Sequence, residues 1–175
     1  MKDSGPVPML VPGRECGACD ACCVVFEIQV PAIAKPAGVP CRHLTKAGCA
    51  IYETRPDMCR KWLCGWRLIP GLPQDWRPDL SGILVYQMAC QEPDYGPDAF
   101  IIALSRGLSH LKDVAVLGFI ENMVKLRVPL YLTRHAGKVD TRSVFLNRSL
   151  EPMIAAGNGP GFIAVLTRLM EQQRS

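Results

Sequence analysis

Cysteine is the residue type in this sequence with the greatest capacity for chemistry, and its distribution along the chain is uneven. Of nine cysteines, eight precede Gly65 and one, Cys90, follows it. The eight early cysteines are Cys16, Cys19, Cys22, Cys23, Cys41, Cys49, Cys59 and Cys64. Thiolates are preferred ligands of zinc and of iron–sulfur clusters. This local density therefore predicts a metal centre, and we expect all eight early cysteines to be its ligands.

The first four cysteines form a Cys-x2-Cys-x2-Cys-Cys run from Cys16 to Cys23. A Cys-x2-Cys turn places two sulfurs close enough to bind one metal, and its backbone amides face the thiolates. Three cysteines at consecutive two-residue intervals resemble the run of bacterial ferredoxins, which favours an iron–sulfur cluster slightly over zinc. The Cys-Pro that ends that run is missing, however, and Cys41 with Cys49 is a candidate second zinc knuckle, so Zn²⁺ stays open.

The number of early thiols is twice the four that complete a tetrahedral zinc site or ligate one cluster. The sequence allows one centre with additional structural thiols, or two centres, and it does not partition the ligands. A disulfide framework is the competing interpretation, but the total of nine is odd and a reducing compartment does not sustain disulfides. We expect Cys90 to be an ordinary apolar thiol, since free cysteine is often buried.

Residues between the cysteines extend the pattern beyond what a chance cluster would share. Cys16-Gly-x-Cys19-x-x-Cys22-Cys23 is followed by Cys41-x-x-Leu44 and then by Cys49-x-Ile51-Tyr52-x-x-Arg55-Pro56-x-x-Cys59-Arg60. This pattern, over residues 14–66, resembles the YkgJ-type CxxCxxCC cysteine-cluster family, described as zinc- or iron-chelating proteins. The resemblance implies a metal-binding module. A similar cluster occurs in flagellin lysine methylases, so the resemblance does not by itself imply one reaction.

Charged and imidazole side chains near the cysteines are candidates to support such a centre. Four thiolates around a divalent ion leave a net charge of about minus two, which nearby arginines offset. The candidate arginines are Arg42, Arg55 and Arg60. His43 lies between Cys41 and Cys49 and is an alternative nitrogen ligand.

Two tryptophans, Trp62 and Trp66, flank Cys64, and we expect them chiefly to pack in the core, with shielding of a cluster as the alternative. The chain has no Ser-His-Asp order, paired-carboxylate signature or His-x-Glu deaminase pattern. Catalytic residues therefore remain unassigned, and whether the protein is an enzyme stays open.

The overall charge gives little indication of partners. The 20 basic and 16 acidic residues are dispersed, with no block of like charge that would bind nucleic acid or a membrane surface. Residues 1–15 lack the apolar run of a signal peptide, and no stretch of about 18 apolar residues occurs. We expect a cytoplasmic protein with no nucleic-acid or membrane partner; a protein or redox partner is not identified.

The elements that must position these residues differ between two parts of the chain. Residues 1–66 are rich in proline and glycine, which interrupt regular structure, and predict an irregular cysteine-rich metal-binding segment. Residues 67–175 predict a small mixed body of a few strands and about three helices. The expected fold class is α+β, with the segment packed on the body as one compact domain.

Hydrophobic patterns predict the elements of the body. Strands are expected at residues 82–88, 130–133 and 143–146, with a turn at Gly137. The three-and-four spacing of apolar residues predicts helices at 111–126 and from 162 toward the carboxyl end. Residues 99–104 form an apolar run too short for periodicity to assign, and we interpret them as helix.

Overall fold

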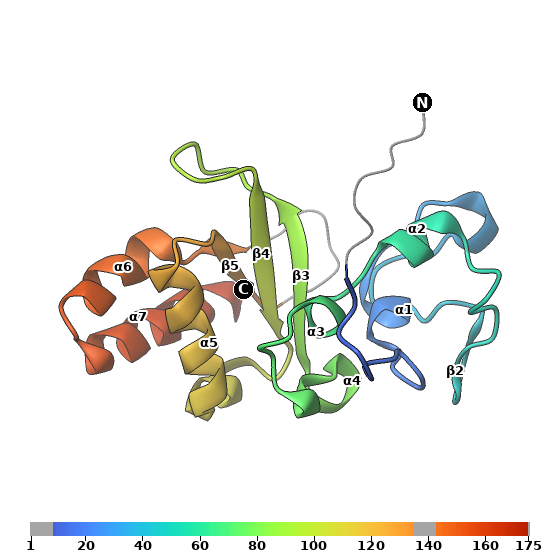
Figure 1. Ribbon diagram of the computed structural model, residues 1–175, viewed down its shortest axis with the longest axis horizontal. Coiled ribbons are helices and arrows are strands. Elements are labelled where there is room, and N and C mark those ends of the chain that lie inside the picture. Colours follow the sequence, from blue (N-terminus) through green and yellow to red (C-terminus); the bar gives the residue numbers. More distant parts are fainter. Residues whose placement is uncertain (1–8, 135–142, 175) are drawn as a thin grey trace.

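The computed structural model describes residues 9–134 and 143–174 and has the expected α+β architecture (Figure 1). The described part of the body contains a sheet of strand order β3-β4-β5-β6. Its strands are β3 (Ile83–Ala89), β4 (Asp98–Leu104), β5 (Leu130–Thr133) and β6 (Val144–Phe145). β4 pairs antiparallel with β3 and parallel with β5, and β6 is antiparallel to β5. The strands expected at 82–88, 130–133 and 143–146 are confirmed; the turn expected at Gly137 lies outside the described residues.

The interpretation of residues 99–104 as helix is wrong, because they belong to strand β4. Ile101 pairs with Tyr86 on one side and Tyr131 on the other, so β4 is an inner strand of the sheet. Both faces of an inner covered strand are buried, and its sequence becomes a continuous apolar run without alternation. Periodicity therefore carries no signal here, and only the neighbouring strands determine the conformation.

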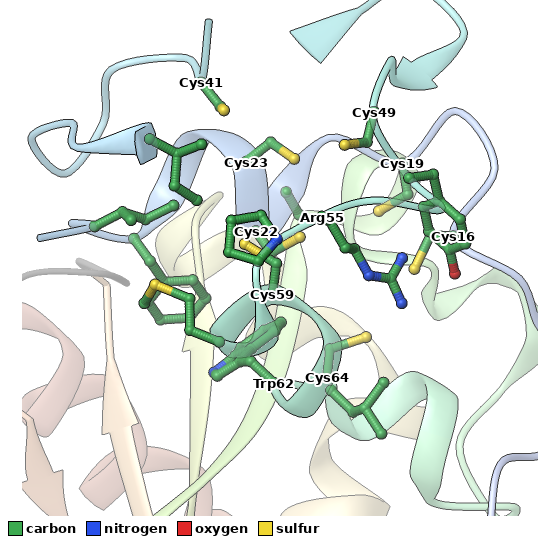
Figure 2. Close-up of a pocket in the computed structure, with 18 of the residues that line it drawn as sticks. Cys16, Cys19, Cys22, Cys23, Cys41, Cys49, Arg55, Cys59, Trp62 and Cys64 are labelled. Carbon is green, nitrogen blue, oxygen red and sulfur yellow. The ribbon is translucent and has the colours of Figure 1, made fainter. Parts of the chain in front are cut away.

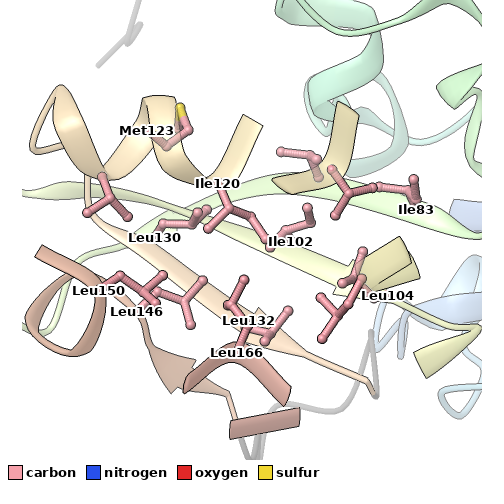
Figure 3. Close-up of a cluster of buried hydrophobic side chains, with 14 of the residues drawn as sticks. Ile83, Ile102, Leu104, Ile120, Met123, Leu130, Leu132, Leu146, Leu150 and Leu166 are labelled. Atoms are coloured by element: carbon pink, nitrogen blue, oxygen red, sulfur yellow. The ribbon is translucent and has the colours of Figure 1, made fainter. Parts of the chain in front are cut away.

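One face of the sheet is covered by helices. η3 (Gly107–Lys112) and α5 (Val114–Lys125) connect the parallel strands β4 and β5, and α6 (Asn147–Ala155) and α7 (Gly159–Glu171) lie on the same side as α5 (Figure 1). Fully buried Ile102, Leu132 and Leu166 belong to the core between them (Figure 3). The expected helices at 111–126 and from 162 are confirmed as α5 and α7, whereas α6 was not expected. Within the described ranges, no helix has the length and apolar character needed to cross a bilayer.

The other face of the sheet is covered by the cysteine-rich segment, which carries the elements α1 (Ala21–Val25), η1 (Pro31–Ile33), β1 (Leu44–Thr45), β2 (Gly48–Cys49) and α2 (Asp57–Lys61). Side chains alternate along β3, so Val85 belongs to the helical side while Leu84 and Tyr86 face the segment. Phe26 and Trp62 pack against this second face. The expected irregular, short-element character of the segment is confirmed.

The segment is joined to the body through short elements: α3 (Gly65–Leu68), η2 (Gln74–Trp76) and α4 (Pro78–Ser81). α3 lies directly on β3, because a Cβ atom at Gly65 would come within 2.8 Å of Val85 Cγ1. Buried Arg14 donates hydrogen bonds to the carbonyl oxygens of Trp66 and Leu72, both at 2.6 Å. This cation satisfies carbonyls at the end of α3 and holds the start of the segment against it.

Candidate metal centre

All eight of the expected ligand cysteines line the same cavity, which has a volume of about 510 Å³ (Figure 2). Every one is an unpaired thiol, and each is partly buried. Cys90 follows β3 and is not among the residues that line the cavity; its thiol lies 3.8 Å from the carbonyl oxygen of Glu92. The fold therefore brings together the cysteines that the spacing groups, and it leaves Cys90 apart.

The cysteines reach the cavity from five short pieces of chain. Cys16 and Cys19 share a tight turn, closed by a 2.8 Å hydrogen bond from the Cys19 amide to the Cys16 carbonyl. Cys22 and Cys23 are neighbours in α1. The β1–β2 hairpin carries Cys49, with Cys41 shortly before it, α2 carries Cys59, and Cys64 is the N-cap of α3.

Glycine allows two of these pieces to approach closely. Gly48 begins β2 with a φ of 106°, a conformation that residues with a Cβ rarely adopt. A Cβ atom at this position would also collide with the backbone carbonyl of Gly17. Gly48 therefore lets the hairpin that carries Cys49 rest directly on the Cys16–Cys19 turn.

Aromatic side chains form the wall of the cavity next to the sheet. Phe26 packs against Trp62 with ring centroids 4.6 Å apart and against Tyr86 at 5.1 Å. Trp62 lines the cavity, whereas Trp66 is only 5% exposed and packs in the main core. The expectation of core packing is thus confirmed for Trp66, while Trp62 takes the position that shields the thiols.

Two arginines, one buried and one partly buried, face the thiols. Arg67 Nη1 lies 3.5 Å from Cys16 Sγ and 3.3 Å from the hydroxyl of Tyr52, and this residue is only 8% exposed. The guanidinium of Arg55 stacks on the ring of the same tyrosine, at 3.7 Å from its centre. In the described part of the protein, the Nε atoms of both arginines are buried without a hydrogen-bond partner. Such donors favour a negatively charged occupant of the cavity.

Lys35 adds a third buried cation beside the thiols. Its ammonium donates to the carbonyl oxygens of Val24 at 3.0 Å and Pro36 at 3.2 Å, and also to that of Phe26. Burial lowers the pKa of Lys35, and the neighbouring Cys41, Cys23 and Cys22 thiols counteract that shift. The lysine thus places positive charge where α1 ends, at the second half of the cysteine run.

The three arginines singled out from the sequence have different positions. Arg55 faces the cavity, but Arg60 is exposed and lies 3.6 Å from the carboxylate of Asp57, and Arg42 is exposed outside the lining. Sequence reasoning missed Arg67 and Lys35. Arg67 follows Cys64 by three residues, one turn of helix, which is a usable signal. Lys35 lies in an irregular stretch that carries no such signal. His43 also lines the cavity.

Burial holds several of these thiols in the protonated form. It raises the pKa of Cys19 from 9.0 to about 12, against the effect of a backbone hydrogen bond at Ala21. The pKa values of Cys59 and Cys64 are also raised, again chiefly by burial. A hydrogen bond from Cys22 to Cys23 raises the pKa of Cys22 and lowers that of Cys23. Cys23 is therefore the first of these thiols to ionise, and ligation of the others requires proton release.

The donor set fits a thiophilic metal, although the sulfurs are spread around the cavity. Across residues 9–134 and 143–174, no three or more His, Cys, Asp or Glu side chains are already arranged to hold one ion. The cavity is much larger than the ~30 Å³ that a water molecule takes up in the liquid, so it exceeds what a single ion needs. Eight sulfurs and two arginines on one cavity, with Lys35 nearby, match the chemistry of one or more thiolate-ligated centres.

Comparisons of the chain with protein-family models, with curated proteins and with solved structures found no match. The resemblance to the YkgJ-type family therefore stays a prediction that depends on the residues quoted above. The chemistry of the site has to be argued from its own side chains.

Proposed function

We propose that this chain is a metal-chelating protein that binds an iron–sulfur cluster, or Zn²⁺, through the eight cysteines of the cavity, with a redox or cluster-dependent role. The observation that carries the proposal is the convergence of unpaired thiols from five pieces of chain on one cavity. Buried Arg67 and Lys35 support it, because cations this well buried are stabilised by nearby negative charge. Ionised thiols ligating a metal would provide that charge.

Two features favour the iron–sulfur form. The cavity volume suits a polynuclear centre better than one small ion. Phe26 and Trp62 also give it an apolar wall, and exclusion of water is one of the means by which proteins tune cluster potentials. A bound cluster would supply one-electron transfer. The chain itself would hold the sulfurs, exclude water and offset charge, and its partner would be a redox protein that remains to be identified.

A zinc-stabilised structural or interaction module without catalysis is the second candidate, and the scarcity of core in the segment favours it. In described residues 9–64, the buried hydrophobic side chains are Ile28 and Ile33. A segment with so few buried apolar groups does not recover its conformational entropy by burial alone. Structural zinc contributes folding free energy directly and would replace the missing core.

Metal analysis of the full chain, purified without oxygen, separates the two forms. Iron and acid-labile sulfide in stoichiometric amounts, with visible charge-transfer absorption, would support the cluster. A colourless protein with stoichiometric zinc and no sulfide would support the zinc module. A protein that holds neither metal under these conditions, even after reconstitution, would contradict the proposal in both forms.

Single substitutions test the ligand assignment. Cys22→Ser or Cys19→Ser should lower the amount of metal that the chain retains and lower the free energy of unfolding by several kcal/mol, on the order of what loss of a structural metal site removes. The matched control is Cys90→Ser, which removes a thiol outside the cavity and should leave the metal content unchanged. Full retention of metal by both cavity variants would show that the ligands are assigned wrongly.

A further inference from the structure

We infer that the eight thiols form two four-thiol centres, with the chain passing from one to the other between Cys22 and Cys23. The first set is Cys16, Cys19, Cys22 and Cys64, and the second set is Cys23, Cys41, Cys49 and Cys59. This inference rests on the proposed function and extends it. Each set is the full thiolate complement of one tetrahedral metal ion or one four-iron cluster.

Hydrogen bonds and proximity connect the members of the first set. The Cys16–Cys19 turn is closed by its own backbone hydrogen bond. Arg67 links this turn to Cys64, because its Nη1 lies 3.5 Å from Cys16 Sγ and its amide donates to the Cys64 carbonyl at 3.0 Å. Coulomb interactions weaken with distance. After Cys23, the thiols whose charge raises the pKa of Cys22 most are Cys16 and Cys19. Figure 2 shows Cys16, Cys19 and Cys64 along one side of the cavity.

A second group of contacts connects the second set, although its hairpin also touches the Cys16–Cys19 turn at Gly48. The Cys41 amide donates to the Cys23 carbonyl at 2.9 Å, which attaches the start of the hairpin to α1. Leu44 bonds to the Cys41 carbonyl and pairs with Cys49 across the hairpin, so the two cysteines are held by the same small unit. The thiols whose charge raises the pKa of Cys59 are Cys23, Cys41 and Cys49. Figure 2 places these three along the upper edge of the cavity.

The helical conformation of α1 explains why adjacent residues serve different sets. Successive side chains on a helix are rotated by about 100° and do not face the same point. Cys22 and Cys23 therefore leave α1 in different directions, as ligands of two separate centres must. Cys22 and Cys23 are consecutive residues whose thiols shift each other's pKa, so the two sets adjoin.

The cations near the thiols are divided in a similar way. Arg67 contacts Cys16 and follows Cys64, both of the first set. Arg55 and Lys35 both lower the pKa of Cys23, and Arg55 lowers that of Cys59. Lys35 interacts most with Cys41 and Cys23 of the second set, and then with Cys22 of the first. Each tetrathiolate centre with a divalent ion carries about two negative charges, so each requires compensation of its own. A cation on each side of the cavity is what two separate centres need.

The test is an anaerobic titration of the metal-stripped full chain with Co²⁺, whose visible spectrum reports thiolate coordination. The unsubstituted chain should take up two equivalents with a tetrathiolate spectrum. The within-set variants, Cys16→Ser with Cys64→Ser and Cys41→Ser with Cys49→Ser, should each keep one tetrathiolate equivalent. The cross-set variant, Cys16→Ser with Cys49→Ser, should keep no tetrathiolate equivalent, although it lacks the same number of thiols as each within-set variant.

Three outcomes would overturn the two-centre arrangement. They are uptake of one equivalent by the unsubstituted chain, loss of both tetrathiolate spectra in a within-set variant, and retention of one in the cross-set variant. Each leaves the proposed function intact, because metal still binds. No uptake of Co²⁺ by the unsubstituted chain would instead contradict the proposed function itself.

A folding control keeps the result interpretable. Far-ultraviolet circular dichroism of each variant should match that of Cys90→Ser, because the sheet and its helices have a core outside the cysteine-rich segment. If a double variant fails this control, the single variants Cys64→Ser and Cys41→Ser replace it. Each should lose one tetrathiolate equivalent and keep the other, and loss of both would overturn the inference.

Discussion

The sheet body and the cysteine-rich segment reach a defined shape by different means. In the body, side chains such as Ile102, Leu132 and Leu166 are fully buried between the sheet and the helices. In the segment, the cavity cysteines are only partly buried, and the helices and strands are two to five residues long. Hydrophobic burial accounts for the first region, as in most domains of this size. The second depends on docking against β3 and, in our proposal, on metal.

Buried polar groups reveal the same difference. Asn147 in the body is fully buried, and its side chain accepts from the Leu130 amide at 2.9 Å and donates to the Val128 carbonyl at 3.0 Å. His110 Nε2 lacks a partner among the described residues, but burial lowers its pKa and favours the neutral form. Arg55 in the segment and Arg67 in α3 have buried Nε atoms with no hydrogen-bond partner in the described part of the chain. Neutral groups therefore account for these buried polar atoms of the body, whereas the unpartnered cationic donors beside the thiols are suited to an anionic centre.

Removal of the metal should have the largest effect and should separate the two regions. Structural zinc contributes roughly 10–16 kcal/mol of binding free energy in small zinc-dependent folds. Removal of the metal with a chelator should therefore expose residues 9–64 to hydrogen exchange while β3, β4 and β5 stay protected. Hydrogen exchange read by mass spectrometry checks this. Equal loss of protection in both regions would show that they are one cooperative unit.

A cavity in the core should affect the body and leave metal stoichiometry unchanged. Leu132→Ala removes a fully buried side chain and should lower the free energy of unfolding by about 2–5 kcal/mol. Urea denaturation followed by circular dichroism measures the loss. The control is Ile163→Ala on α7, which is 42% exposed and should change stability by less than about 0.5 kcal/mol. Loss of metal from folded Leu132→Ala would contradict the separation.

Substitution at the closest approach within the segment should weaken metal binding. Gly48→Ala forces a Cβ into a positive-φ residue and against the Gly17 carbonyl, at a cost of about 1–3 kcal/mol. The hairpin with Cys49 should move away from the Cys16–Cys19 turn, which a competition assay for Zn²⁺ would detect as lower affinity. Gly71→Ala is the matched control, because a Cβ there meets no atom within 4 Å. Equal affinities would show that the hairpin position is unimportant.

Metal affinity should rise with pH, because ligation releases thiol protons. Burial raises the pKa of Cys19 to about 12, so this thiol is protonated near neutral pH in the metal-free chain. Each proton displaced changes the affinity tenfold per pH unit, about 1.4 kcal/mol. In the metal-free chain the same raised pKa stabilises the fold below pH 9.0, and that contribution is lost as pH rises toward about 12. Zn²⁺ competition at several pH values checks the first trend and alkaline unfolding the second.

The smallest predicted effect concerns the tyrosine between the two arginines. Tyr52→Phe removes the hydroxyl that lies 3.3 Å from Arg67 Nη1 but keeps the ring that supports Arg55. The loss of one hydrogen bond to a charged group should cost about 1–3 kcal/mol at most and lower metal affinity by a similar amount. Tyr95→Phe is the control, since its hydroxyl bonds to Glu151 in the body, at 2.7 Å. A change in metal affinity with Tyr95→Phe would break the comparison between the regions.

The sequence by itself determined which thiols belong together, because Cys-x2-Cys spacing acts within a single turn of chain and Cys90 stands far from the rest. It also determined the α+β class, strands β3 and β5 from their short apolar runs with β-branched or aromatic residues, and helices α5 and α7 from apolar residues that recur with a local period. These features depend on contacts between residues close in the chain.

Tertiary structure decided what depends on distant partners. β4 is a strand because β3 and β5 pair with it on both sides, a fact that its own apolar run does not contain. Arg67 and Lys35 reach the thiols because α3 docks on β3 and because Lys35 satisfies the carbonyls that end α1, whereas exposed Arg42 and Arg60 stay outside the cavity. Charge acts through space, so its effect on a thiol depends on distances that only the folded chain sets.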